Sequence, residues 1–230
     1  MSTASASPLP EVRWSFSAGK VGAEAWSVVH LEAREAMSDL YHARLVLQME
    51  TGGGGLDDLL GKPAKLETHR GSISRELKGI VSEVEELGTT AEHRFVRVDV
   101  VPALWMLSQR SDCRIFQEKN TAQIVREVLA AAGVYQGDAA LRIDPSLESQ
   151  PPREYCVQYQ ETDLAFLRRM LEDEGIPFYF AHDGEGESES WVICADDHSW
   201  TEVSTLDGAS VPVRDMGMST AATESFHWFD

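Results

Sequence analysis

The segment from Arg153 to Phe180 constrains the fold of this chain most, because it encodes a strand, a capped helix and a second strand in close succession. Over residues 153–160 the side chains alternate with the period of a strand, which places Tyr155, Val157 and Tyr159 on one face. The segment contains no recognisable catalytic motif. We therefore interpret the segment as a structural part of the fold and not as a catalytic site.

The helix inside this segment is defined at both ends. Thr162 can cap its first turn with a hydroxyl group, and Asp163 suits the positive end of the helix dipole. Gly175 ends the helix, and Pro177 prevents it from resuming. Its apolar residues recur at the three-and-four spacing of an amphipathic helix: Leu164, Phe166, Leu167, Met170 and Leu171.

This segment resembles the corresponding part of VgrG proteins, the spike and hub subunits of type VI secretion systems. The N-terminal module of that family is shared with phage baseplate hubs and phage late-control protein D. The resemblance runs from about Val12 to about Asp197 and departs at Lys78, where the family usually carries histidine. It therefore implies no role for that ring here. The other matching segments, in the family's order, are Trp26–Leu47, Gly61–Pro63, Leu77–Val84, Val101–Gln117 and Asn120–Gly133.

Composition limits the size of the fold and its partners. The chain has 230 residues, 43% of them hydrophobic, which is enough to bury one or two cores. Lysines and arginines number 20 against 38 acids, so the formal charge is −18. This charge repels nucleic-acid phosphates and anionic lipids, and we expect neither nucleic-acid binding nor membrane insertion. The acidic surplus could line a channel or keep an unassembled subunit soluble.

The start of the chain and its cysteines indicate the compartment. No apolar run approaches the roughly 20 residues that span a bilayer, and residues 1–10 lack a basic start and a hydrophobic stretch. We expect the protein to be made in the cytoplasm. Cys113, Cys156 and Cys194 are widely spaced among apolar or strand-like neighbours, which predicts reduced core thiols.

The chain divides near Trp105. Short alternating runs precede it and helices interrupt the strands after it, so we predict a β-dominated α+β fold. With the resemblance, this gives two barrel-like tail-hub domains: residues 11–105, and residues 106–230 with a helical insertion and an incomplete C-terminal end. The strands expected in the first domain are Val12–Phe16, Trp26–Leu31, Tyr41–Met49, Lys65–Arg70, Glu76–Val84 and Phe95–Val101.

The second domain begins with a helix over Thr121–Ala132, capped by Asn120 and stopped by Gly133. We predict a loop over 138–152 and an exposed hairpin tip over 183–190, between strands at 178–181 and 191–195. Residues 224–230 read as a strand that ends on aromatic residues. This suggests a truncated chain, because in the family the hub continues into a small barrel and a trimeric spike.

Two possible ligand sites lack the required spacing. The glycines at 52–55 resemble a phosphate loop, but Gly61 lies one residue too far on, and Pro63 replaces the magnesium-binding serine or threonine. We interpret the segment as a flexible turn. No paired metal-ligand spacing supports the other candidate set, which is Cys194, Asp196, Asp197 and His198, with Cys156 across a sheet.

Catalytic chemistry has no positive support either. Two acidic runs, 83–86 and 172–174, contain possible glycosidase pairs, but such runs are usually solvated faces. No nucleophile elbow accompanies the scattered histidines. Arg110, Asp112 and Arg114 are interpreted as a fold-locking ion pair. We predict no catalytic, cofactor-binding or metal-binding residue and no cofactor.

The resemblance implies a mechanical function. The chain would be a hub that connects a hexameric inner tube to a trimeric spike, and it would contact itself as a homotrimer, the tube protein and baseplate proteins. A spike-tip protein and effectors would bind through C-terminal regions. The hub would assemble in the cytoplasm and be secreted or injected into a target cell on firing. Whether the parent belongs to a secretion system or to a phage particle is left open.

Two other classes of protein are alternatives to the hub. A cell-wall hydrolase carried by a tail spike would lose activity when one acidic pair is mutated. A ligand-binding β-barrel would be a monomer whose melting temperature rises with its ligand.

Overall fold

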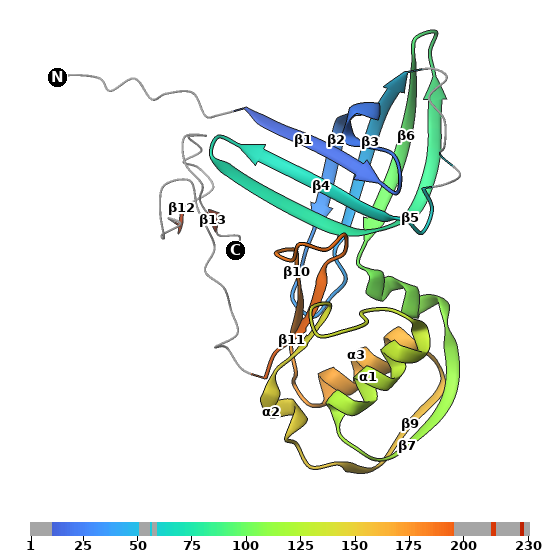
Figure 1. The fold of residues 1–230 in the computed structure, drawn as a ribbon, viewed down its shortest axis with the longest axis vertical. Coiled ribbons are helices and arrows are strands. Elements are labelled where there is room, and N and C mark those ends of the chain that lie inside the picture. The colour runs from blue at the N-terminus through green and yellow to red at the C-terminus, as the bar shows by residue number, and fades with distance from the viewer. Residues whose placement is uncertain (1–10, 51–55, 57–58, 196–212, 215–225, 228–230) are drawn as a thin grey trace, which may run out of the picture.

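The computed structural model describes residues 11–50, 56, 59–195, 213–214 and 226–227. It shows two units, each with its own hydrophobic core: a curled six-stranded sheet, and a lobe of helices and short strands (Figure 1). Strands dominate the described residues, and within them helices follow the first unit, apart from short 3-10 turns. This confirms the predicted β-dominated α+β class.

The curled sheet is antiparallel throughout, with the strand order β1-β4-β5-β6-β3-β2. Its two edge strands, β1 and β2, approach each other and are linked through the short 3-10 helix η1, Ala23–Ala25. The sheet is therefore barrel-like. Its strands are β1 (Val12–Ala18), β2 (Ser27–Arg34), β3 (His42–Glu50), β4 (Pro63–Arg70), β5 (Ile73–Thr89) and β6 (His93–Val101).

Strand β5 makes the sheet curl. Its first half pairs with β4 and its second half pairs with β6, and Ile80 lies opposite both Pro63 and Val101. Register shifts follow at Val81/Glu83 and at Glu86/Gly88, and such irregularities bend a strand and increase its twist. One long strand thus belongs to both halves of the sheet.

The faces of β3 follow the sequence pattern. The inward side chains of β3, and that of Tyr41 just before it, are all buried, as predicted: Tyr41, Ala43, Leu45, Leu47 and Met49. On the outer face, Arg44 and His42 both bind the carboxylate of the buried Asp99, with distances of 2.8 and 3.0 Å to Oδ2. Burial alone would raise the pKa of Asp99, but the hydrogen bonds from Arg44 and His42 hold it below its usual value.

The lobe begins with the 3-10 helix η3, Ala103–Gln109, and contains two long helices, one short helix and two small sheets. Strands β7 and β9 form an antiparallel ribbon, and β10-β11-β8 form a three-stranded sheet. The elements are β7 (Ser111–Lys119), α1 (Thr121–Ala132), β8 (Leu141–Ile143), α2 (Pro145–Glu148), β9 (Arg153–Thr162), α3 (Asp163–Asp173), β10 (Phe178–Ala181) and β11 (Ser190–Ile193). Farther along the chain, β12 (Val213–Arg214) pairs in parallel with β13 (Phe226–His227).

Both long helices begin and end where the sequence predicts. Asn120 accepts a hydrogen bond from Gln123 N at 2.9 Å in a capping box, and Gly133 ends α1 in the left-handed conformation. Thr162 accepts from Ala165 N at 3.1 Å at the start of α3. The apolar stripe of α3 is buried, with Phe166 and Leu167 almost inaccessible.

The ion pair predicted at the start of the lobe is present, and Asp163 is its buried centre. Asp163 Oδ2 lies 3.2 Å from Arg114 Nη2 and 3.5 Å from Arg110 Nε. Arg114 also binds Asp112, at 2.8 Å. Gln158 donates to the other oxygen of Asp163, at 2.9 Å. A carboxylate without exposed surface thus has a partner at each oxygen, as a buried charge requires.

Three expectations were wrong. The loop predicted over 138–152 contains β8 and α2, because Leu141 packs into the core and Asp144 caps α2 ahead of Pro145. The hairpin tip is not wholly exposed, since Glu189 and Ser190 are buried. Cys113 is exposed and not in the core. The three cysteines, all described, form no disulfide. Of the strand expected over 224–230, only β13 lies within the described residues.

Gly79 is a testable requirement of the β5 bend. A Cβ atom there would clash with the carbonyl oxygen of Val101 and lie 2.6 Å from Tyr41 Oη. We expect Gly79→Ala to lower the free energy of unfolding by about 1–3 kcal/mol, the usual cost of overpacking. Gly186→Ala is the matched control, since its Cβ would meet nothing closer than Ser188 N at 4.0 Å. Urea unfolding measures both, and equal stabilities would contradict the packing argument.

Candidate functional site

The two units meet at a seam of buried polar groups. The β10–β11 hairpin rises from the lobe and ends against β5 of the curled sheet (Figure 1). The loop before β3 also reaches the lobe: Ser38 N donates to Phe178 O at 2.9 Å, and Asp39 binds Arg168 at 3.0 Å. The seam therefore fixes how the curled sheet sits on the lobe.

Glu189 is the central acceptor of this seam. Its Oε1 accepts from Ala103 N at 2.7 Å and from the hydroxyl of Tyr135. Tyr135 in turn accepts from Leu104 N at 3.1 Å. One carboxyl group thereby ties the start of β11 to the first turn of η3 and to the segment after α1.

On the sheet side, Lys78 makes contacts through three of its groups. Its carbonyl oxygen accepts from the hydroxyl of Tyr41, and its backbone N–H donates to His182 Nδ1 at 3.0 Å. Its ammonium group donates to Gly184 O and lies 3.2 Å from Glu76. The lysine that departs from the family pattern is thus a buried seam residue, and the imidazole beside it comes from His182.

Burial shifts the pKa values of the seam groups. It raises the pKa of Glu189, although the hydrogen bonds from Tyr135 and Ala103 act in the opposite direction. It also raises the pKa values of Tyr135 and Tyr41, and the nearby Glu189 charge adds to both shifts. Burial, with the positive charges of Arg75 and Lys78, lowers the pKa of His182 to about 4. Each shift favours the neutral form of its group.

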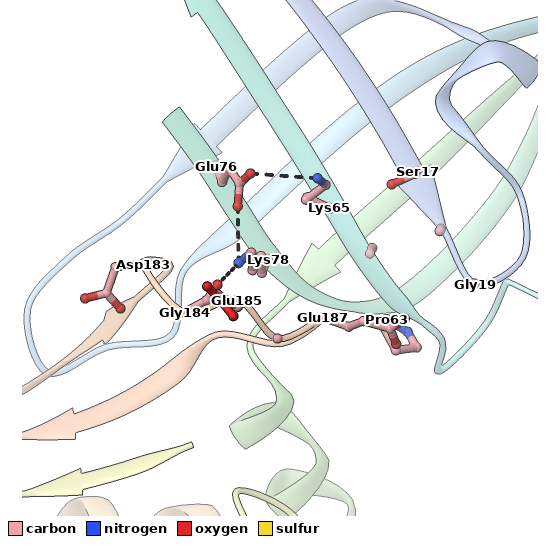
Figure 2. Close-up of a pocket in the computed structure, with 13 residues that line it drawn as sticks. Ser17, Gly19, Pro63, Lys65, Glu76, Lys78, Asp183, Gly184, Glu185 and Glu187 are labelled. Atoms are coloured by element: carbon pink, nitrogen blue, oxygen red, sulfur yellow. Dashed lines mark hydrogen bonds and ion pairs between the residues drawn. The ribbon is translucent and has the colours of Figure 1, made fainter. Parts of the chain in front are cut away.

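A cavity of about 550 Å³ lies beside the seam, between β1, β4 and β5 and the hairpin tip (Figure 2). Lys65, Glu76 and Lys78 point into it from the strands, and Glu185 and Glu187 come from the tip. Glu76 lies 3.7 Å from Lys65 and 3.2 Å from Lys78. Among the described residues, those that line the cavity include no histidine or cysteine. The ionisable groups that line it are carboxylates and lysines, and Glu76 is paired with both lysines.

The acidic runs weighed as glycosidase pairs are paired on the surface. Glu83 and Glu85 bind Arg97 on the neighbouring strand at 2.7 and 2.6 Å. Glu86 binds Arg94 at 2.6 Å, and this hydrogen bond lowers its pKa, whereas a general acid needs a raised one. In the other run, Glu174 holds Thr121 and Arg153, and Glu172 lies 3.9 Å from Arg168. The structure brings neither run into a catalytic arrangement.

The proposed ligand sets fall largely outside the described residues. The glycines at 52–55 lie there, as do Asp196, Asp197 and His198. Cys156 and Cys194 are both buried. Within the part of the chain that the structure describes, no three histidine, cysteine or acidic residues are grouped to hold a metal ion. No helix in that same part is long and apolar enough to cross a membrane.

Sequence reasoning missed Glu189, His182 and Tyr135. Glu189 stands in an acidic glycine-rich run that is typical of solvent-exposed loops. A usable signal was present, because Glu189 and Ser190 come directly before the apolar run Trp191–Ile193. That position predicts a strand entrance and not a loop tip.

Comparison with known sequences identifies similar proteins. The family described as phage tail baseplate hub (GPD) matches residues 34–230. The type VI secretion system spike protein VgrG1b of Pseudomonas aeruginosa is 34% identical over 194 residues, which is 84% of this chain and 25% of that protein. VgrG1c of the same organism is 32% identical over 211 residues, 91% of this chain and 28% of that protein. The chain thus spans about a quarter of the length of these relatives.

Solved structures share the fold. The E. coli c3393 protein, described as a type VI secretion component similar to the T4 bacteriophage tail proteins gp27 and gp5, superposes with a TM-score of 0.67 and 21% identity. That match covers 84% of this chain and 48% of the other. A 43 kDa tail protein of prophage MuSo2 from Shewanella oneidensis gives 0.55 at 15% identity, over 89% and 56% of the two chains.

We expect the free energy of unfolding to fall in acid because of the seam residue His182. His182 has a folded-state pKa of about 4, below its ordinary value of 6.5, so its contribution is complete above about pH 6.5 and is lost as the pH falls toward 4. The full shift corresponds to about 3 kcal/mol. We expect His182→Gln, which keeps an acceptor for Lys78 N, to reduce this loss. Urea unfolding at about pH 7.5 and pH 4.5 measures it, and an equal loss in both proteins would contradict the assignment.

The contribution of Glu189 to stability should change with pH in the opposite direction to that of His182. Because its pKa is raised in the folded state, its contribution is complete below its unfolded pKa and is lost as the pH rises through the folded value. We expect Glu189→Gln to gain stability relative to the wild type between about pH 4.5 and pH 7.5. The same unfolding series tests this expectation. A variant whose difference from the wild type is constant over that range would show that Glu189 does not titrate there.

Proposed function

This chain belongs to the phage tail baseplate hub (GPD) family, and we propose that it is the hub module of a contractile injection machine, connecting a hexameric inner tube to a trimeric spike. The observation that carries the proposal is the family match over residues 34–230, together with the curled sheet. The relatives named as type VI spike proteins favour a secretion system as the parent machine.

The edges of the curled sheet suit assembly into a ring. Strands β1 and β2 lie at the two ends of the strand order, and each pairs with a described strand on one side only. Open strand edges are prone to pair with other chains, and a closed ring of copies covers such edges. We therefore propose that three copies assemble through this unit. In the hub scheme, two similar barrels per chain present six surfaces to the hexameric tube.

The interior of the curled sheet does not favour the ligand-binding barrel. Leu45, Leu47, Val96 and Val98 are fully buried there, and Phe16 and Tyr41 fill the space between them. A small barrel filled by side chains has no room for a ligand. This unit acts instead as a rigid block.

A structural and not an enzymatic role also suits the seam. The Glu189 carboxyl group has the raised pKa of a general acid, but it is only 1% exposed and its Oε1 is already hydrogen-bonded. Substrate has no access to it. We assign the seam to holding the two units together, and we propose no hydrolase activity.

The remaining partners follow from the same scheme. Baseplate proteins would surround the hub, and a spike-tip protein and effectors would bind through regions corresponding to the rest of the longer relatives. The hub would assemble in the cytoplasm and leave the cell, or enter a target cell, when the machine fires.

Mass measurement with the tube protein tests the proposal. We expect light scattering after gel filtration to show a trimer of this chain, or a trimer that forms when purified hexamers of the cognate tube protein are added. A tube protein from an unrelated machine serves as the control for specificity. A chain that stays monomeric and leaves the hexamer peak unchanged would contradict the hub function.

A further inference from the structure

The outer face of the β7–β9 ribbon carries a cluster of exposed apolar side chains. Ile115 and Val157 lie directly opposite each other in the antiparallel pair, and Tyr155 and Tyr159 flank Val157 on the same face. The exposed fractions of Ile115, Tyr155, Val157 and Tyr159 are 62%, 54%, 37% and 69%. Together they expose roughly 400 Å², and apolar patches of this size on a monomer are often functional. We call these four residues the ribbon patch.

The ribbon patch is held rigidly from behind. On the inner face of the ribbon, Phe116 stacks on Phe166 of α3, with ring centroids 5.5 Å apart. Gln158 is fully buried and donates to Asp163 and to the Glu161 carbonyl oxygen, at 2.9 and 3.1 Å. Helices α1 and α3 lie on one side of the ribbon, and the other side faces outward (Figure 1). The patch is therefore presented as a fixed surface.

The charge distribution sets the patch apart. A quarter of the residues in this chain are charged and the net charge is −18. Between Cys113 and Gln117 on β7, and between Tyr155 and Tyr159 on β9, the outward side chains carry no charge. Two copies of such an acidic protein repel each other over most of their surfaces, and close approach costs less where one of the two contact surfaces carries no charge.

We infer that the ribbon patch is covered by a second copy of this chain. Interface cores are depleted in charge and enriched in tyrosine, as this patch is. A standard interface buries about 800 Å² on each partner, so the patch would supply about half of one side. It would therefore act beside the contacts of the curled sheet. This inference rests on the proposed assembly of three copies and adds a second contact surface, in the lobe, to it.

In a closed ring of three, the contact joins unlike surfaces. The patch of one copy then faces a different surface of the next copy, and all three patches become covered together. Cys113 reports this event, because it is exposed on β7 at the register shift of the ribbon, two residues before Ile115, while Cys156 and Cys194 are buried. Its reactivity distinguishes an open patch from a covered one.

The test inserts a charge into the patch of the 230-residue chain. We expect Ile115→Lys to raise the dissociation constant of the trimer at least tenfold in sedimentation velocity over a concentration series. Because lysine reduces the net negative charge, weaker assembly would report loss of apolar contact and not added repulsion. Leu87→Lys is the matched control: Leu87 is 48% exposed but lies on β5 of the other unit. Unchanged thermal melting confirms that both variants fold.

Labelling of Cys113 with a maleimide separates the possible outcomes. We expect labelling of the wild type to slow several-fold as trimers form, and labelling of Ile115→Lys to stay fast at the same concentration. A wild-type trimer with fast labelling, assembled equally well by Ile115→Lys, would overturn the patch contact and leave the hub function standing. Slow labelling only after tube hexamers are added to a preformed trimer would assign the patch to the tube protein. A wild type that remains monomeric throughout would overturn the patch contact, and its failure to bind tube hexamers would also contradict the hub function.

Discussion

The relative position of the two units depends on one buried carboxyl group, that of Glu189. Glu189 Oε1 accepts hydrogen bonds from the backbone N–H of Ala103 in η3 and from the hydroxyl of Tyr135 in the segment after α1. A buried acceptor is costly without partners, so each donor that it binds is held in place. The first turn of η3 carries the chain out of the curled sheet. Its attachment to β11 therefore sets the angle between the units.

On the sheet side, the seam is fixed by the contacts of Lys78. Lys78 uses its carbonyl oxygen, its N–H and its ammonium group on four partners, of which two, His182 and Gly184, lie more than a hundred residues away in the sequence. Gly79 beside it allows β5 to approach Val101 and Tyr41 closely. The same stretch that bends the sheet thus also receives the lobe. In the proposed hub role, this joint would keep the two units in one fixed arrangement.

The sequence pattern predicts those features of the fold that depend on residues close together in the chain. The alternation of β3 identified its buried face, and the caps Asn120 and Thr162 located two helices to the residue. The strand β8 escaped prediction because it has only three residues and pairs with β11, which lies about fifty residues farther along the chain. Glu189 escaped because its acidic, glycine-rich surroundings are typical of an exposed loop, whereas its burial arises from contacts with residues 103 and 135. No candidate for catalysis was proposed from the sequence. Arginines pair with the acidic runs of β5 and α3 at the surface. The one other partner described above is Thr121, which donates to Glu174.

The shared pairing of β5 also has a mechanical consequence. Because its first half pairs with β4 and its second half with β6, a pull along β5 loads both hydrogen-bond ladders in shear, so many bonds must break at once. A pull across the strands would instead open the ladders one bond at a time. The curled sheet is therefore strongest along β5 and weakest at its β1 and β2 edges. The resistance of the curled sheet to force therefore depends on the direction of the pull.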